Sequence, residues 1–178
     1  MKRDRDVVLH PGELYFGSSP TRIGTLLGSC VSICIWHPKL KIGGMCHYLL
    51  PTRGGDRAVQ YCAKYADEAF FMFLKELEKS GTKPHEYEAK LFGGGNMFHG
   101  KGQRIHRHRN HLEKISSVKE PNVASLNVAA ARDLARLHGF SIKAEDLGGL
   151  GYREVIFDLQ DGRAWSRHRE NAPREEAC

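Results

Sequence analysis

The chain has 178 residues, and its 27 Lys and Arg residues outnumber its 21 Asp and Glu residues to give a net charge of +6. Hydrophobic residues make up 40% and charged residues 27%, a composition that excludes a disordered or low-complexity chain. No apolar run approaches the ~18 residues of a membrane span, and the N-terminus lacks the apolar core of a signal peptide. We therefore expect a cytoplasmic protein without membrane insertion, built as one domain over residues 1–178 rather than two small ones.

Short runs of β-branched and aromatic residues dominate the first fifty positions. After a loose start at residues 1–10, these runs predict strands over residues 13–16, 22–27, 30–36 and 42–50. The segment His37-Pro38-Lys39-Leu40 separates the last two strands and is typical of a turn.

Two amphipathic helices are expected further along the chain. Apolar residues recur at helical spacing over about 57–79, where Asp56 can cap the start and Ser80-Gly81 the end. A second helix spans roughly 123–138 and stops at Gly139. Its predicted apolar face consists of Leu126, Ala130, Leu134 and Leu137. We expect the apolar face of the first helix to be core rather than a docking face for a partner helix.

The rest of the chain alternates strand patterns with loops. Further strands are predicted over residues 88–92, 141–146, 153–158 and 163–166. Asp161-Gly162 is a hairpin signal before the last of them. The stretch 99–120 is expected to be a long basic loop, and residues 167–178 a loose charged tail. Strands outnumber helices and follow one another in hairpin runs, so the sequence predicts an α+β fold with largely antiparallel sheet and no internal repeat.

The long basic loop carries two further patterns. Positions 101–109 hold four basic side chains and no acidic one, which indicates a solvated surface or, as the alternative, a docking patch for an acidic partner such as nucleic acid. His106, His108 and His111 lie close together in the sequence, as metal ligands do, but no cysteine is nearby. We favour the solvated loop in both cases and predict neither a nucleic-acid partner nor a metal site.

Cysteine usage points to thiols rather than disulfides. The chain has five cysteines, an odd number, and no CxxC pair. A disulfide framework is therefore not expected, and each cysteine is either a small core residue or a working thiol. We predict that Cys34, Cys46 and Cys62 are packing residues, the last on the apolar face of the first helix.

Cys30 is the candidate for a working thiol. If the strands on either side of residues 37–40 pair as a hairpin, Trp36 faces Lys41 and Cys30 lies directly opposite His47. Directly opposed residues share a face, with Cβ atoms ~4.5–5.5 Å apart, which brings a thiol within reach of an imidazole. An imidazole that takes the thiol proton makes the sulfur a nucleophile.

Neighbouring residues support this chemistry. Gly28 and Ser29 allow a tight bend whose backbone N–H groups can stabilise an oxyanion, and Thr25 is close enough to orient the imidazole through its hydroxyl. From spacing alone the alternative stays open that Cys30 is a buried hydrophobe and His47 a satisfied core or surface histidine. The glycine run at 93–95 lacks the spacing of a nucleotide-binding loop, and we expect it to permit a close backbone approach beside the site.

Several segments of the chain resemble one protein family. Residues 25–31, 43–51 and 90–98 read TLLGSCV, GGMCHYLLP and KLFGGGNMF, and they are followed by NV at 127–128 and DLGG at 146–149. In this order, over roughly residues 10–165, they resemble the chemoreceptor glutamine deamidases (the CheD family). The chain departs from the family in its longer, more basic stretch 99–120, and in having Tyr152-Arg153 where the family commonly has Gly-Arg.

The resemblance implies a fold and a function. The fold would be a sandwich related to bacterial toxin deamidases, here with largely antiparallel sheets flanked by the two predicted helices. The activity would be hydrolysis of particular glutamines on chemoreceptor cytoplasmic helices, to glutamate and ammonia, without a cofactor or a metal. The family's catalytic cysteine, histidine and threonine map onto Cys30, His47 and Thr25, with Gly28 and Ser29 beside the oxyanion. A chemotaxis phosphatase of the CheC type is the implied partner.

Two other functions are compatible with the same residues. A receptor methylesterase would use the same Cys30–His47 pair and release methanol instead of ammonia. A non-catalytic adaptor would bind and regulate the chemotaxis phosphatase without needing the thiol. Neither the choice of receptor glutamines nor the oligomeric state can be predicted from the sequence.

Overall fold

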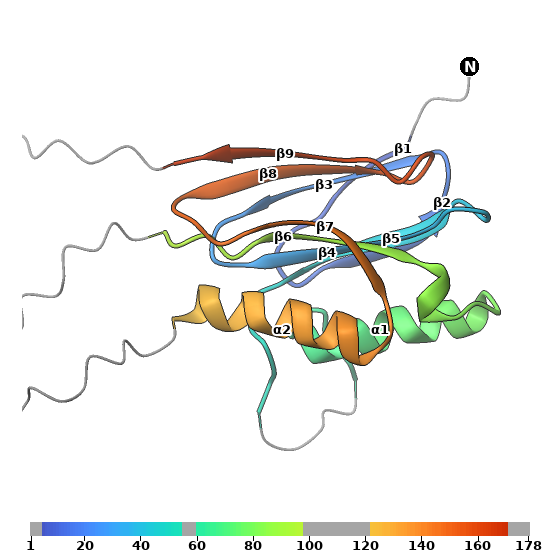
Figure 1. Ribbon diagram of the computed structural model, residues 1–178, viewed down its shortest axis with the longest axis horizontal. Helices are drawn as coiled ribbons and strands as arrows, with labels where there is room; N and C mark the ends of the chain where they lie inside the picture. Colours follow the sequence, from blue (N-terminus) through green and yellow to red (C-terminus); the bar gives the residue numbers. More distant parts are fainter. Residues whose placement is uncertain (1–4, 55–59, 98–121, 171–178) are drawn as a thin grey trace, which may run out of the picture.

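The computed structural model describes residues 5–54, 60–97 and 122–170 (Figure 1). Its strands are β1 (Arg5–Val8), β2 (Leu14–Ser18), β3 (Thr21–Leu27), β4 (Val31–His37), β5 (Ile42–Tyr48), β6 (Glu88–Gly93), β7 (Ser141–Leu147), β8 (Tyr152–Asp158) and β9 (Ala164–Arg169). Its helices are α1 (Ala66–Lys79), α2 (Val123–Leu137) and the short 3-10 turn η1 (Pro84–Glu86). The basic stretch 99–120, which includes His106, His108 and His111, lies outside the described residues.

The described elements form three layers, as Figure 1 shows. One sheet has the strand order β1-β3-β8-β9 and the other β2-β5-β4-β6-β7, and α1 and α2 cover the outer face of the five-stranded sheet. Of the seven strand pairings, β1–β3 and β6–β7 are parallel and the other five are antiparallel. The predicted α+β sandwich with largely antiparallel sheets and two flanking helices is confirmed.

Two hydrophobic cores hold the layers together. On β3, buried and exposed residues alternate, so that Ile23 faces the other sheet, as expected for a sheet with one face in solvent. On β4 both faces are buried: Cys34 joins the core between the sheets, while Ile33 and Ile35 join the core beneath the helices. Cys46 also belongs to the helix-side core, which confirms that Cys34 and Cys46 are packing residues.

The register of the β4–β5 hairpin differs from the predicted one. Ser32, rather than Cys30, is the partner of His47, because the turn begins one residue later than expected. His37 remains in the strand, since its buried ring packs edge-on against the tyrosine that precedes β6, with 5.2 Å between ring centroids. Lys41 closes the turn with a left-handed φ of 52°. The predicted direct opposition of Cys30 and His47 was therefore wrong by two positions.

Helix α1 is shorter than predicted. It begins at Ala66, well after the start that apolar spacing indicated, and the predicted cap lies outside the described residues. The backbone just before the helix pairs with the end of β5 instead: the N–H groups of Leu49 and Leu50 donate to the Lys64 carbonyl at 2.9 and 3.2 Å. Cys62 lies in this segment and is only partly buried, so its placement on the helix face was wrong.

The two helices differ in how well their buried faces were predicted. On α1, Phe70, Phe73 and Leu77 are buried in the helix-side core, as expected. On α2 the predicted face was wrong for Leu126 and Leu137, which are exposed, whereas Ala130 and Leu134 pack, partly buried, against the helix-side core. The residues that α2 buries are small: Ala124, Asn127, Ala131 and Ala135. Small residues let α2 approach its neighbours closely, so its most buried positions hold no large apolar side chain.

Two strands extend into segments that were expected to be loose. Strand β1 lies within residues 1–10 and pairs in parallel with β3, and β9 continues to Arg169 opposite β8. The Asp161-Gly162 hairpin signal is confirmed, and Gly162 supplies a left-handed φ of 72°. Within the described ranges, neither helix has the length and apolar character that a membrane crossing requires.

Candidate active site

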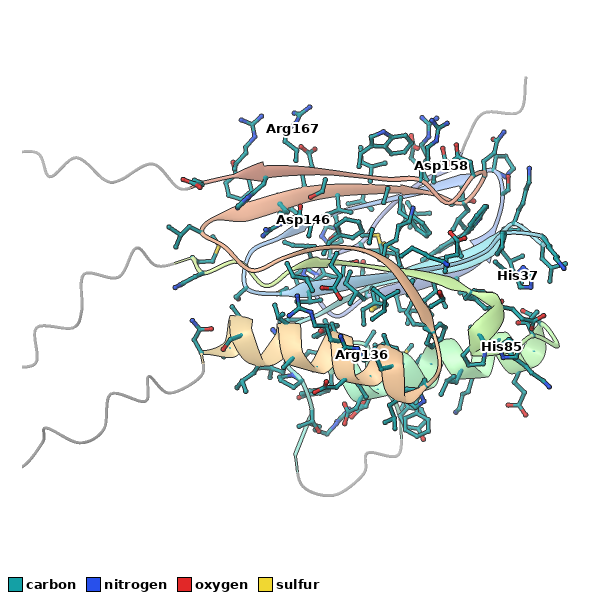
Figure 2. All side chains as sticks on the ribbon, in the orientation of Figure 1. His37, His85, Arg136, Asp146, Asp158 and Arg167 are labelled. Carbon is teal, nitrogen blue, oxygen red and sulfur yellow. The ribbon has the colours of Figure 1, made fainter. Side chains whose placement is uncertain are left out.

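One end of the sandwich gathers several loops around Cys30. The residue directly precedes β4, at the opposite end of the β4–β5 hairpin from His37, which Figure 2 labels. The carbonyl of Gly28 accepts a hydrogen bond from the Gly95 N–H at 2.8 Å, and the carbonyl of Cys30 accepts one from the Gly94 N–H at 2.7 Å. The predicted close approach of the glycine run to the cysteine loop is therefore present.

The glycines of this run fill positions that no side chain can occupy. Gly93 has a φ of 108°, and a Cβ atom there would overlap the carbonyl oxygen of Cys30. Gly94 has a φ of 66°, and a Cβ atom there would overlap the side chain of Val128 on α2. The run thus fixes both the cysteine loop and the helix by direct backbone contact.

His47 lies between the two sheets, 2% exposed, with one ring nitrogen fixed. Its Nδ1 is 2.8 Å from the Thr25 Oγ1 of the opposite sheet, and Thr25 Oγ1 donates to the Leu9 carbonyl at 2.8 Å. A threonine hydroxyl has a single proton to donate. Because that proton goes to the Leu9 carbonyl, Thr25 accepts from Nδ1–H of His47, and the lone pair of the neutral ring is on Nε2.

The electrostatics of His47 keep its ring unprotonated. Nε2 is buried and has no hydrogen-bond partner among the described residues. Burial lowers the pKa of His47 to about 4, and the nearby Glu13 carboxylate opposes that shift only in part. The ring is therefore neutral near pH 7, with Nε2 available to take a proton.

Cys30 shares a face of the sheet with His47. Ser32 is the partner of His47, and Cys30 precedes Ser32 by two residues, which places both on the same side of an extended chain. Cys30 is partly buried and packs against the core between the sheets. Diagonal neighbours of this kind have Cα atoms roughly 7–8 Å apart. Burial raises the pKa of the Cys30 thiol, so both the thiol and the imidazole are neutral at rest.

Gly28 and Ser29 form the predicted bend between β3 and β4. Their carbonyls both accept hydrogen bonds, that of Ser29 from the Asn127 Nδ2 at 3.1 Å. In a trans peptide the N–H points opposite to the C=O. With the carbonyls turned into the protein, the N–H groups of Ser29 and Cys30 point the other way, and such donors can face a developing oxyanion.

The loop after β7 reaches the same end of the molecule. The N–H of Gly148 donates to the Gly93 carbonyl at 2.8 Å. Arg153, which follows the departure from the family pattern, is paired with Leu27 and makes a 2.9 Å ion pair with Asp146, labelled in Figure 2. This turn is remote from Cys30 in the sequence but borders the cysteine loop in space.

One buried residue at this end was not predicted as part of the site. Asn127 is fully buried on α2, and its side chain reaches the loop before Cys30. The signal was a polar residue at helical spacing from Ala124 and Ala131, in the middle of a buried apolar face. Asn127 was noted only as part of the NV segment that resembles the family, and hydrophobic periodicity did not place it on the buried face.

A large hollow lies elsewhere on the surface. It has a volume of about 770 Å³ and is lined by residues of β1, β3, β8 and β9, among them Leu26, Ile156 and Trp165. Neither Cys30 nor His47 lines it. Thr25, whose hydroxyl bonds to His47 Nδ1, is among its lining residues, so of the three candidate catalytic residues only Cys30 and His47 lie outside it.

Comparison with known proteins gives concordant matches. Residues 49–168 match the family model described as "CheD chemotactic sensory transduction". The chain is 47% identical to a protein of Pseudomonas savastanoi pv. phaseolicola named "Probable chemoreceptor glutamine deamidase CheD", over 92% of this chain and 84% of the relative. A protein of Dechloromonas aromatica named "Probable chemoreceptor glutamine deamidase CheD 3" is 40% identical, over 96% of this chain and 91% of the relative. A protein of Leptospira interrogans named "Probable chemoreceptor glutamine deamidase CheD 1" is 38% identical, over 93% of this chain and 94% of the relative.

Proposed function

Because the chain belongs to the CheD family, it is a chemoreceptor glutamine deamidase, and we propose that Cys30, His47 and Thr25 carry out its chemistry. As an amidohydrolase it converts glutamine side chains of chemoreceptors to glutamate and releases ammonia. The whole chain would act as one catalytic domain. The single observation that best supports the assignment is the hydrogen-bond relay from His47 through Thr25 to Leu9, because it leaves Nε2 as the free base on the face shared with Cys30.

The first half-reaction forms a thioester. Cys30 Sγ attacks the carboxamide carbon of the glutamine while its proton passes to His47 Nε2. The N–H groups of Ser29 and Cys30 stabilise the oxyanion of the tetrahedral intermediate. His47 then gives the proton to the leaving nitrogen, and ammonia departs as the carbonyl reforms.

The second half-reaction restores the enzyme. His47 Nε2 takes a proton from a water molecule that attacks the thioester carbon, and the second tetrahedral intermediate expels the Cys30 sulfur. Thr25 keeps the proton on Nδ1 in both halves, so the ring always exchanges protons through Nε2. The raised pKa of the thiol and the lowered pKa of the imidazole mean that the proton moves during attack. Catalytic contacts often tighten only once substrate is bound.

The partners follow from the substrate. Chemoreceptors are the substrate class, and the glutamines that this enzyme reaches would lie on their cytoplasmic helices, which would place the protein in the cytoplasm. Each turnover adds a negative charge to a receptor helix and so changes the repulsion between packed helices. A CheC-type phosphatase is the regulatory partner that the family resemblance implies.

The decisive experiment compares Cys30→Ala with Cys62→Ala, a partly buried cysteine outside the site. Each variant is incubated with receptor cytoplasmic fragments, and the products are followed as ammonia, methanol and the Gln-to-Glu mass shift. We expect ammonia release by the wild type and Cys62→Ala, and none by Cys30→Ala with an unchanged circular-dichroism spectrum. Undiminished release by Cys30→Ala would refute the nucleophile. Methanol in place of ammonia would favour the methylesterase, and full adaptation in cells carrying Cys30→Ala would favour the adaptor.

A further inference from the structure

The segments that carry Cys30 and His47 are joined by one side chain from a third element. Asn127, on the second turn of α2, donates from Nδ2 to the Ser29 carbonyl at 3.1 Å and to the Leu49 carbonyl at 2.8 Å. Ser29 directly precedes the nucleophile, and Leu49 follows His47 by two residues. A single amide group therefore holds both segments in a fixed relation.

The orientation of this amide follows from its partners. An asparagine amide has two N–H protons on one side and an acceptor oxygen on the other. Both of its partners at this site are carbonyl oxygens, which can only accept, so the NH₂ group must face them. The opposite orientation would bring three oxygens together without a proton between them. Asn127 is also fully buried, which makes its two donated bonds costly to break.

The amide acts where the strand ladder ends. The last paired residues of β4 and β5 at this end are Val31 and Tyr48. One step beyond them, the chains pass through Ser29–Cys30 and through Leu49, outside both strands. The Asn127 amide bridges the two chains at the position where a ladder hydrogen bond would otherwise connect them.

The helix that presents this amide is itself tied to the base-bearing strand. The Tyr48 hydroxyl, fully buried beside His47 in the sequence, donates to the Asn127 backbone carbonyl at 2.5 Å. At the start of α2, the Asn122 side chain accepts from the Ser125 N–H at 2.9 Å and caps the helix. The Tyr48 bond therefore holds the helix against the sheet at Asn127 itself, whereas the Asn122 cap lies at the distant helix start.

We propose that Asn127 is a positioning residue for the deamidase reaction, which holds the Cys30 loop at working distance from His47. The inference rests on the proposed roles of Cys30 and His47. Removing the two hydrogen bonds would let the loop relax, and the thiol would lose its proton acceptor without losing the substrate surface. The loss is therefore expected in kcat rather than in KM, and in the reactivity of the thiol itself.

The test compares Asn127→Ala and the isosteric Asn127→Asp with the control Asn122→Ala. The control removes the side-chain cap at the start of the same helix but no contact to Ser29 or Leu49. We expect kcat for ammonia release to fall at least 30-fold in both Asn127 variants with KM within threefold, and to stay within threefold in Asn122→Ala. We also expect iodoacetamide alkylation of Cys30 at pH 7, followed by peptide mass spectrometry, to slow at least tenfold in the Asn127 variants.

Asn127→Asp adds a signature that loss of stability would not produce. At low pH its buried carboxyl is protonated and can donate one hydrogen bond, so its alkylation rate relative to wild type should recover partly as the pH falls. Unchanged kcat and alkylation in folded Asn127 variants would overturn the proposal. If neither variant folds, Asn127→Ser is measured instead; its hydroxyl has one proton and can keep at most one of the two bonds, and unchanged values there would overturn the proposal as well.

The alkylation readout keeps this proposal separate from the assignment of function. If the wild type released no ammonia but Asn127 variants still lost thiol reactivity, the deamidase mechanism would fail and the positioning role would stand. If ammonia release were normal in the wild type and in the Asn127 variants alike, the positioning role alone would fail.

Discussion

Thr25→Val is the substitution that tests the orientation of His47 most directly. Valine replaces the hydroxyl by a methyl group of similar volume, so packing between the sheets is retained. Two hydrogen bonds are lost: the one from Nδ1–H of His47 and the one to the Leu9 carbonyl, each 2.8 Å long in the native protein. Both remaining groups stay buried, since the position is 6% exposed.

The expected magnitudes follow from those two bonds. A typical buried hydrogen bond contributes about 0.5–1.5 kcal/mol, so the free energy of unfolding should fall by about 1–3 kcal/mol. For catalysis, losing the acceptor removes the preference for a proton on Nδ1, which at ~1.4 kcal/mol per factor of ten is worth up to about tenfold. Freer rotation of the ring adds to this. We expect kcat to fall by about 10- to 100-fold, within the range of a general base.

The assay pairs Thr25→Val with Thr25→Ser, which keeps the hydroxyl and loses only a methyl group. Ammonia release and Cys30 alkylation are measured for both, together with urea unfolding at pH 7. Thr25→Ser should recover most of the lost kcat even though it loses about 0.8 kcal/mol of apolar burial. Equal kcat in Thr25→Val and the wild type would refute the argument that the hydroxyl fixes the ring.

Two more outcomes are expected. Gly93→Ala should unfold at clearly lower urea concentration than the wild type and should lose most Cys30 alkylation. Its control is Gly139→Ala, which is also left-handed at φ 79° but has open space around its Cβ position, and which should cost only about 1 kcal/mol. Equal losses in the two variants would contradict the argument that the Gly93 contact matters. The native pKa of His47, lowered to about 4 by burial, lies below the ~6.5 of an unfolded chain, so the unfolded state binds a proton that the native state excludes. Stability should therefore drop as the pH falls from about 6.5 to 4, more steeply in wild type than in His47→Gln, and parallel urea-midpoint curves would count against a buried neutral ring.

Local patterns predicted the elements better than their ends. The short apolar runs at β3 and β4 predicted strands correctly, because such runs reflect burial on one or two faces of a sheet. The start of α1 could not be found in this way. Its apolar spacing continues upstream of Ala66, but the Lys64 carbonyl is engaged by Leu49 and Leu50, and such a tertiary hydrogen bond leaves no trace in helical periodicity.

The buried face of α2 shows a second limit of sequence patterns. Leucines define the strongest apolar stripe, yet Leu126 and Leu137 are exposed and alanines are buried. Residue size decides this, since α2 lies so close to the glycine run that a Cβ atom on Gly94 would overlap Val128. Where a helix packs closely, the small residues mark the interface and hydropathy alone ranks the faces wrongly.

The sequence nominated Cys30, His47 and Thr25 as candidates, but it did not specify the register that relates the first two. The hairpin turn begins one residue later than expected, so the partner of His47 is Ser32, two positions along from the expected Cys30. Side chains alternate with a period of two, so an even change preserves the face and an odd change would have reversed it. Cys30 and His47 therefore still share the inner face as diagonal neighbours. Cys30 lies just beyond the last ladder pair of the hairpin, where no strand hydrogen bonds connect the two segments. At that point the Asn127 side chain of α2 bonds to both segments.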